Sequence, residues 1–180
     1  MPAFPRIDCL EIEGSSSLYL GAHPFEGLEE AADTKQKCER LEEYITLVRS
    51  LFIETFVVLL PEMELQTANH GCNLLYQYRN RGLSVVYFPI ENFGVPDAID
   101  KFDELLKTIA ERLEKAPVLV HCLSGCGRTG MVASGFLIRL GSNVEDAIAR
   151  VNRVHPKASH TVKQILFLKE YRKWLKQRNA

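Results

Sequence analysis

Residues 118–130 constrain the fold most, because a short apolar run leads directly into a glycine-containing loop and then into a helical pattern. The segment reads Val-Leu-Val-His-Cys-Leu-Ser-Gly-Cys-Gly-Arg-Thr-Gly. A strand, a tight loop and a helix in this order gather the loop's backbone N–H groups at the positive end of the helix, where a tetrahedral oxyanion can bind. We expect six residues to form this anion site: Leu123, Ser124, Gly125, Cys126, Gly127 and Arg128.

Two reactive side chains frame this loop. Cys122 ends the apolar run, and Arg128 stands at the start of the helix. The helix terminus, the loop N–H groups and the guanidinium all favour the thiolate, which is the nucleophilic form of a cysteine. The planar fork of Arg128 can hold two oxygens of one anion. The alternative interpretation of Cys122 is a small core residue, but the arginine at this spacing favours phosphate chemistry through a cysteine nucleophile.

The rest of the chain alternates between strand and helix patterns. Strands are expected at residues 17–21, 54–60, 84–88 and 118–120. Helices are expected at residues 35–52 (capped by Asp33 and Thr34), 73–81, 129–140, 144–154 and 161–176, with one more opened by Pro96 and Asp97. This order predicts an α/β fold with a mostly parallel central sheet flanked by helices. No repeat or linker divides the sequence, so we expect one domain over residues 1–180.

Composition excludes several classes of protein. The chain has 22 basic and 23 acidic residues, a formal net charge of −1, so its bulk charge implies no nucleic-acid partner. No apolar stretch approaches the roughly 18 residues needed to span a bilayer, and the first residues lack a signal-peptide core. Five cysteines favour the reducing cytosol, or the nucleus, over a disulfide scaffold. The His and acidic residues show no metal-binding pattern, so we expect no metal. We also expect no cofactor, and we expect the protein to be a monomer.

The pattern His-Cys-x-x-Gly-x-x-Arg-Thr resembles the signature of the cysteine-dependent protein tyrosine and dual-specificity phosphatases at every defined position. Residues 88–96 occupy the place of that family's mobile acid loop, and residues 161–164, Thr-Val-Lys-Gln, the place of its glutamine loop. From Leu18 to Leu175 the order of segments resembles the small single-domain members, the cyclin-dependent kinase-associated phosphatase above all. The resemblance implies a phosphotyrosine protein phosphatase-like fold and a phosphorylated protein as substrate.

The resemblance also implies roles for matching residues. Cys122 would take the phosphoryl group as phosphocysteine while Arg128 and the loop amides hold its oxygens. Gln164 would place the hydrolytic water, or is a surface residue of its helix. Thr129 would stabilise the departing thiolate, or is an ordinary residue of the first helical turn. His121 would support the loop rather than transfer a proton.

The substrate class stays open between phosphotyrosine alone and phosphotyrosine together with phosphoserine and phosphothreonine, and the short chain favours the dual-specificity type. Lipid phosphatases of the superfamily tend to carry lysines inside the loop, where this chain has Leu123 and Cys126, which disfavours a phosphoinositide. The alternative from another class is a phosphate-binding pseudophosphatase or adaptor with little turnover.

One departure from the family pattern concerns the acid that protonates the leaving group. The loop reads Pro-Ile-Glu-Asn-Phe-Gly over residues 89–94 and places Asn92 where the family carries an aspartic acid, and an amide cannot donate a proton as an acid does. Glu91 could substitute. Asp97 could also do so, or it caps the next helix. In the third case no acid exists and the enzyme depends on good leaving groups.

Oxidation is a further expectation of the sequence. An accessible thiolate is the first target of peroxide, and a nearby thiol protects it by forming a disulfide. Cys126 in the same loop and Cys72 ahead of the strand at residues 84–88 are the candidate partners of Cys122. The alternative for both is that they are inert packing residues.

Overall fold

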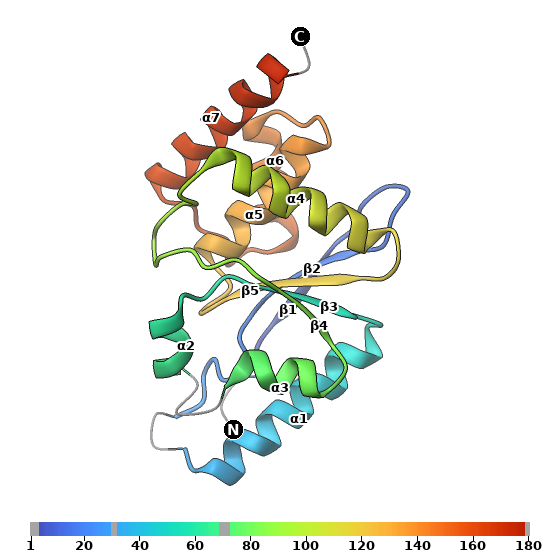
Figure 1. The fold of residues 1–180 in the computed structure, drawn as a ribbon, viewed down its shortest axis with the longest axis vertical. Coiled ribbons are helices and arrows are strands. Elements are labelled where there is room, and N and C mark those ends of the chain that lie inside the picture. The colour runs from blue at the N-terminus through green and yellow to red at the C-terminus, as the bar shows by residue number, and fades with distance from the viewer. Residues whose placement is uncertain (1–3, 30–31, 69–72, 179–180) are drawn as a thin grey trace.

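The computed structural model describes residues 4–29, 32–68 and 73–178, in which five strands form one sheet between two layers of helices (Figure 1). The strands are β1 (Ile7–Leu10), β2 (Leu18–Ala22), β3 (Thr55–Val58), β4 (Ser84–Tyr87) and β5 (Val118–Cys122). Their order in the sheet is β1-β2-β5-β3-β4, in which β1 runs antiparallel to β2 and every other pairing is parallel. The predicted α/β class with a mostly parallel sheet is confirmed.

The helices cover the two faces of the sheet (Figure 1). On one face lie α1 (Thr34–Ser50) and α3 (Leu74–Asn80), and on the other α4 (Ile99–Leu113), α5 (Gly127–Arg139), α6 (Val144–Val154) and α7 (Val162–Arg178). Alternate residues of β3 point to opposite faces of the sheet. Phe56 and Val58 therefore pack in the hydrophobic core under α1 and α3, and Val57 packs in the core under α4, α5, α6 and α7. The short helix α2 (Glu62–Ala68) follows β3.

The central strand and the helix that follows it are almost entirely buried. All five residues of β5 are buried between its parallel neighbours β2 and β3. Helix α5 is buried along most of its length, and a Cβ on Gly135 would stand 2.5 Å from the ring of Phe102 in α4. These close contacts hold the end of β5 and the start of α5 firmly in place.

Several predicted elements need correction. Strand β1 and helix α2 were not predicted, because four and seven residues are too few to show a clear period. The helix expected from Pro96 and Asp97 begins at Ile99 with Ala98 as its N-cap, so Asp97 is not the cap. The cap predicted for α1 is confirmed, since Asp33 accepts from the Gln36 N–H and forms a capping box with it.

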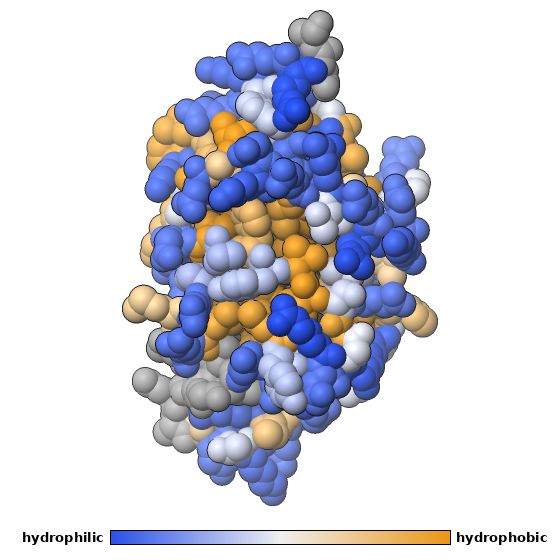
Figure 2. Space-filling view, viewed as in Figure 1, coloured by the Kyte–Doolittle hydropathy of each residue, from blue (hydrophilic) through white to orange (hydrophobic). Residues whose placement is uncertain are grey.

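The surface of the described residues shows one apolar region on the face drawn in Figure 2. Hydrophobic surface gathers across the middle of this face between two hydrophilic ends, where the edge strand β4 lies in Figure 1. Strand β4 is only partly covered, and its Tyr87 is exposed. Within the described ranges, no helix combines the length and the apolar character that a membrane crossing requires.

Candidate active site

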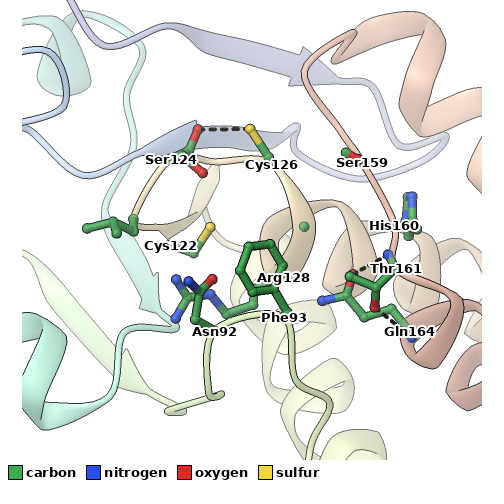
Figure 3. A pocket seen from close by; sticks show the side chains of 12 residues that line it. Asn92, Phe93, Cys122, Ser124, Cys126, Arg128, Ser159, His160, Thr161 and Gln164 are labelled. Carbon is green, nitrogen blue, oxygen red and sulfur yellow. Dashed lines mark hydrogen bonds between the residues drawn. The ribbon is translucent and has the colours of Figure 1, made fainter.

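The carboxyl end of β5 opens into a cavity of about 390 Å³. Figure 3 shows the loop between β5 and α5 on one side of it and residues 159–164, ahead of and within the first turn of α7, on the other. The lining residues are Asn92, Phe93, Cys122, Leu123, Ser124, Cys126, Gly127, Arg128, Ser159, His160, Thr161 and Gln164. The cavity therefore brings together segments that are far apart in the sequence.

The loop takes its shape from Gly125. This residue has φ +74°, a left-handed conformation that glycine adopts at little cost. A Cβ at this position would lie 2.8 Å from the carbonyl atoms of Gly21 and 3.0 Å from the backbone nitrogen of Ala22. The loop thus packs directly on the end of β2, and both the backbone angle and the available space require glycine there.

Cys122 is the last residue of β5 and is only 1% exposed, yet it lines the cavity. Its neighbour His121 is fully buried in edge-to-face contact with the rings of Phe56 and Tyr78, and its Nδ1 lies 3.3 Å from the Cys122 carbonyl oxygen. The pKa of His121 is lowered to about 4, mainly by burial and also by the positive charge of Arg128, while the hydrogen bond to the Cys122 carbonyl opposes the shift. A neutral His121 that donates to this carbonyl supports the loop and is a poor proton donor to a substrate.

Arg128 uses one edge of its guanidinium for structure. Nη1 donates to Glu64 Oε1 at 3.1 Å and to the Ile90 carbonyl at 2.9 Å, while Nη2 donates to Glu64 Oε2 at 2.8 Å. A guanidinium has five N–H groups, so these contacts leave the Nε–H and one Nη2–H, which have no partner within the described ranges. That pair forms a fork of the kind that binds two oxygens of a phosphate.

Glu64 lies on α2, and the sequence does not predict it as a site residue. Its carboxylate is about one-fifth exposed, whereas the Arg128 side chain is 3% exposed. A lone glutamate after Leu-Pro-Glu-Met carries no local signal of a partner 64 residues away. Only the docking of α2 beside the β5–α5 loop reveals the pair.

Gln164 is fully buried, so its interpretation as a helix-surface residue is wrong. Its side-chain oxygen accepts from the Thr161 N–H at 3.0 Å, and the Thr161 hydroxyl accepts from the Gln164 N–H at 3.2 Å. Its Nε2 donates to the Gly94 carbonyl at 3.0 Å. These contacts fix Gln164 at the cavity wall and tie it to the segment that carries Asn92.

The predicted acid-loop residues separate into two groups. Asn92 and Phe93 line the cavity, whereas Glu91 and Asp97 are exposed and do not line it. Phe93 has φ +58°, a left-handed conformation that is rare for a bulky residue, and its side chain is 71% exposed at the cavity mouth. The turn closes with a hydrogen bond from the Gly94 N–H to the Glu91 carbonyl at 2.8 Å.

The remaining predicted residues occupy varied places. Thr129 is buried outside the lining, and its hydroxyl donates to the Gly21 carbonyl at 3.4 Å. Cys126 lines the cavity as a free thiol 3.5 Å from the Ser124 carbonyl. Cys72 lies outside the described residues, so its pairing with Cys122 stays a prediction. Among the described residues no cluster of His, Cys, Asp and Glu could hold a metal ion.

Comparison with known proteins agrees with this geometry. The profile of a family described as "Polymorphic toxin system, DSP-PTPase phosphatase" matches residues 33–142, more than half of the 180-residue chain. The chain belongs to this phosphatase family. It is a cysteine-based protein tyrosine or dual-specificity phosphatase, as its sequence predicts, and a phosphocysteine mechanism is general to this family.

Individual relatives support the same family. Human protein tyrosine phosphatase type IVA 3 is 29% identical to this phosphatase over 126 residues, which are 67% of this chain and 72% of the relative. Rat cyclin-dependent kinase inhibitor 3 is 33% identical over 104 residues, which are 56% of this chain and 49% of the relative. The matched part is therefore about half of that second protein.

Solved structures resemble nearly the whole chain. A kinase-associated phosphatase with serine in place of its catalytic-site cysteine has a TM-score of 0.78 at 26% identity, and the match covers 96% of this phosphatase and 97% of that chain. Tk-PTP in its active form has a TM-score of 0.67 at 28% identity, with 92% and 96% covered. The predicted likeness to the kinase-associated phosphatase is thus confirmed.

Proposed function

We propose that this phosphatase hydrolyses phosphotyrosine on proteins, with Cys122 as the nucleophile and Arg128 as the main ligand of the phosphoryl oxygens. One observation carries the assignment. Cys122 and Arg128 line the same cavity, and the contacts of Arg128 with Glu64 and Ile90 leave its Nε–H and one Nη2–H available to a phosphoryl group. The loop N–H groups of residues 123–128 complete the anion site.

The first step transfers the phosphoryl group to sulfur. The Cys122 thiolate attacks phosphorus in line, an S–P bond forms, and the bond from phosphorus to the leaving oxygen breaks. Arg128 and the loop amides stabilise the three equatorial oxygens throughout. No metal is required in this proposal, because one guanidinium and several fixed N–H groups supply the positive charge.

The second step hydrolyses the phosphocysteine. A water molecule near Gln164 attacks phosphorus, the S–P bond breaks, and phosphate leaves while the Cys122 thiolate is regenerated. Gln164 suits this task because three hydrogen bonds hold its side chain and its backbone N–H at the cavity wall. We assign Thr129 to bracing the loop on β2 rather than to stabilising the thiolate, since its hydroxyl contacts the Gly21 carbonyl.

Two features favour an aryl phosphate such as phosphotyrosine. Asn92 stands at the cavity where an acid would protonate the leaving oxygen, and an aryl oxide needs that proton far less than an alkoxide does. Phe93 holds an exposed ring beside the same cavity, suited to packing on an aromatic leaving group. Leu123 and Cys126 carry no positive charge toward a polyanionic inositol headgroup.

The test compares substrates on the wild-type protein. Phosphate release is measured with a phosphotyrosine peptide, the matching phosphoserine and phosphothreonine peptides, and phosphoinositide vesicles. We expect turnover of the phosphotyrosine peptide with a burst of aryl alcohol under rapid mixing. Binding of tungstate without turnover of any ester would instead identify a phosphate-binding adaptor, for which the amide at Asn92 is the observation in favour.

We also propose that the protein works as a monomer in a reducing compartment, the cytosol or the nucleus. The four described cysteines, Cys9, Cys38, Cys122 and Cys126, are all free thiols. Two of them are exposed, which suits a reducing environment. Fractionation of cells and light scattering of the purified protein test the two parts separately.

A further inference from the structure

A buried histidine lies behind the phosphate-binding loop and outside the cavity. His155 is the C-cap residue that follows α6, and it is 1% exposed. Its backbone is fixed on both sides, because its N–H donates to the Val151 carbonyl at 2.8 Å and its carbonyl accepts from the Ala158 N–H at 2.9 Å. Pro156 restricts the same turn further. The imidazole therefore projects from a rigid support.

Both ring nitrogens of His155 contact acceptors. Nε2 lies 2.7 Å from the Gly125 carbonyl oxygen, and Nδ1 lies 2.6 Å from Asp8 Oδ2. A carbonyl oxygen only accepts, so Nε2 must carry a proton. The other oxygen of Asp8 accepts from Arg6 Nε at 2.6 Å, and this contact holds the carboxylate beside the ring. His155 thus joins Asp8 of β1 to the loop through its two ring nitrogens.

This contact decides the direction of one loop peptide. The C=O of Gly125 and the N–H of Cys126 belong to the same planar trans peptide and point in opposite directions. The carbonyl faces His155 outside the cavity, and Cys126 lines the cavity. A hydrogen bond to the Gly125 carbonyl polarises the peptide, so that the Cys126 N–H becomes a better donor.

We propose that His155, oriented by Asp8, is a positioning residue that keeps the Gly125–Cys126 peptide turned with its N–H toward the bound oxyanion. Without this contact the peptide can rotate and present the Gly125 carbonyl, a negative dipole end, to the anion. The inference rests on the proposed function in one respect only, that the oxyanion is the phosphoryl group of a substrate.

Two amide substitutions separate the two contacts of the ring. The nitrogen of asparagine can occupy the place of Nδ1 and reach only Asp8, whereas the nitrogen of glutamine can occupy the place of Nε2 and reach the Gly125 carbonyl. His155→Asn and His155→Gln differ by one methylene and bury similar polar groups. Arg150→Gln is the matched control, because Arg150 also ties α6 to the N-terminal segment, through the Glu11 carbonyl, but does not contact the loop.

The readout is tungstate binding by calorimetry, with the rate of Cys122 alkylation by iodoacetamide as a second measure. We expect His155→Asn to weaken tungstate binding by between about 10-fold and 100-fold, the upper end being the loss of a whole oxyanion donor. The alkylation rate should fall in parallel. We expect His155→Gln to stay within about threefold of the wild type and Arg150→Gln to match it.

A purely structural role for His155 would lower the melting temperature of both His155 variants and leave tungstate affinity unchanged, which overturns the inference. Equal losses in His155→Asn and His155→Gln overturn it as well. If the wild-type protein binds tungstate but releases no phosphate from any ester, the proposed function fails while the positioning role stands. If the wild-type protein does not bind tungstate at all, both fail.

Discussion

Glu64 and Arg128 form a two-point contact, Oε1 to Nη1 at 3.1 Å and Oε2 to Nη2 at 2.8 Å, across 64 residues of sequence. The carboxylate occupies one edge of the guanidinium and leaves the Nε edge available to an oxyanion. This contact fixes the guanidinium in one orientation. Because the Arg128 side chain is already ordered in the folded protein, less conformational entropy is lost when an oxyanion binds.

Replacing Glu64 tests this arrangement. Glu64→Gln removes the charge opposite a guanidinium that is 3% exposed, and we expect kcat/KM for an aryl phosphate to fall by about 10- to 100-fold. Glu62→Gln in the same short helix is the control, since Glu62 is exposed and interacts with Gln66 and Tyr87 rather than with Arg128. Steady-state kinetics of the wild type and both variants with an aryl phosphate measure kcat and KM separately. A lower KM in Glu64→Gln would contradict the prediction, because it would mean that Glu64 competes with the substrate for Arg128.

The nucleophile can be separated from the anion site. Cys122→Ser keeps the loop amides and Arg128, so tungstate should still bind, while turnover should fall by more than about 10⁴-fold. Cys38→Ser, at an exposed thiol on α1, should retain full activity. Rates of phosphate release and calorimetric titrations measure the two properties. Substantial remaining turnover in Cys122→Ser would remove the basis of the proposed mechanism.

An acid introduced into the cavity should raise activity. Asn92 lines the cavity, and Asn92→Asp puts a carboxyl where the leaving oxygen departs. General acid catalysis typically contributes about 10²–10⁴-fold, so we expect at least a tenfold rise in kcat for phosphotyrosine and a new fall in rate on the alkaline side. The pH–rate profiles of Glu91→Gln and Asp97→Asn serve as comparisons. No gain from Asn92→Asp, together with a hundredfold loss in one of those two, would show that the acid lies there.

His121 should make the protein less stable in mild acid. Burial lowers its pKa from 6.5 to about 4, so between these values the unfolded chain binds a proton that the folded protein excludes. The free energy of unfolding is therefore not reduced by His121 above pH 6.5. It decreases as the pH falls from 6.5 toward 4, by at most about 3 kcal/mol.

Urea unfolding at pH 7 and pH 5 tests this expectation. His121→Gln removes the titrating group, so the difference in stability between the wild type and this variant should shrink as the pH falls. A difference that does not change with pH would show that His121 does not titrate in this range.

The long elements and the loop chemistry could be predicted from the sequence because each signal is local. The capping box at Asp33 lies within four residues, and the Cys122 and Arg128 spacing lies within seven. Strand β1 at the sheet edge has four residues and helix α2 has seven. Segments this short show no hydrophobic period that can be distinguished from chance.

The contacts that the sequence could not reveal join distant segments. Glu64 meets Arg128, Gln164 meets the Gly94 carbonyl, and His155 meets Asp8. Each pair depends on how helices dock on the sheet, which no single window of sequence records. The predicted Asp97 cap was wrong because the helix begins at Ile99, and Ala98 rather than Asp97 occupies the N-cap position.

The close packing of Gly125 on Gly21 and Ala22 has a consequence for how the protein matures. The loop cannot take its final shape until β2 has paired with β5, about one hundred residues further along the chain. Contacts between residues so far apart in the sequence form slowly, because the chain loses conformational entropy before these contacts stabilise it. The anion site of a newly made polypeptide therefore cannot form before the chain has been made at least through β5 and the loop that follows it.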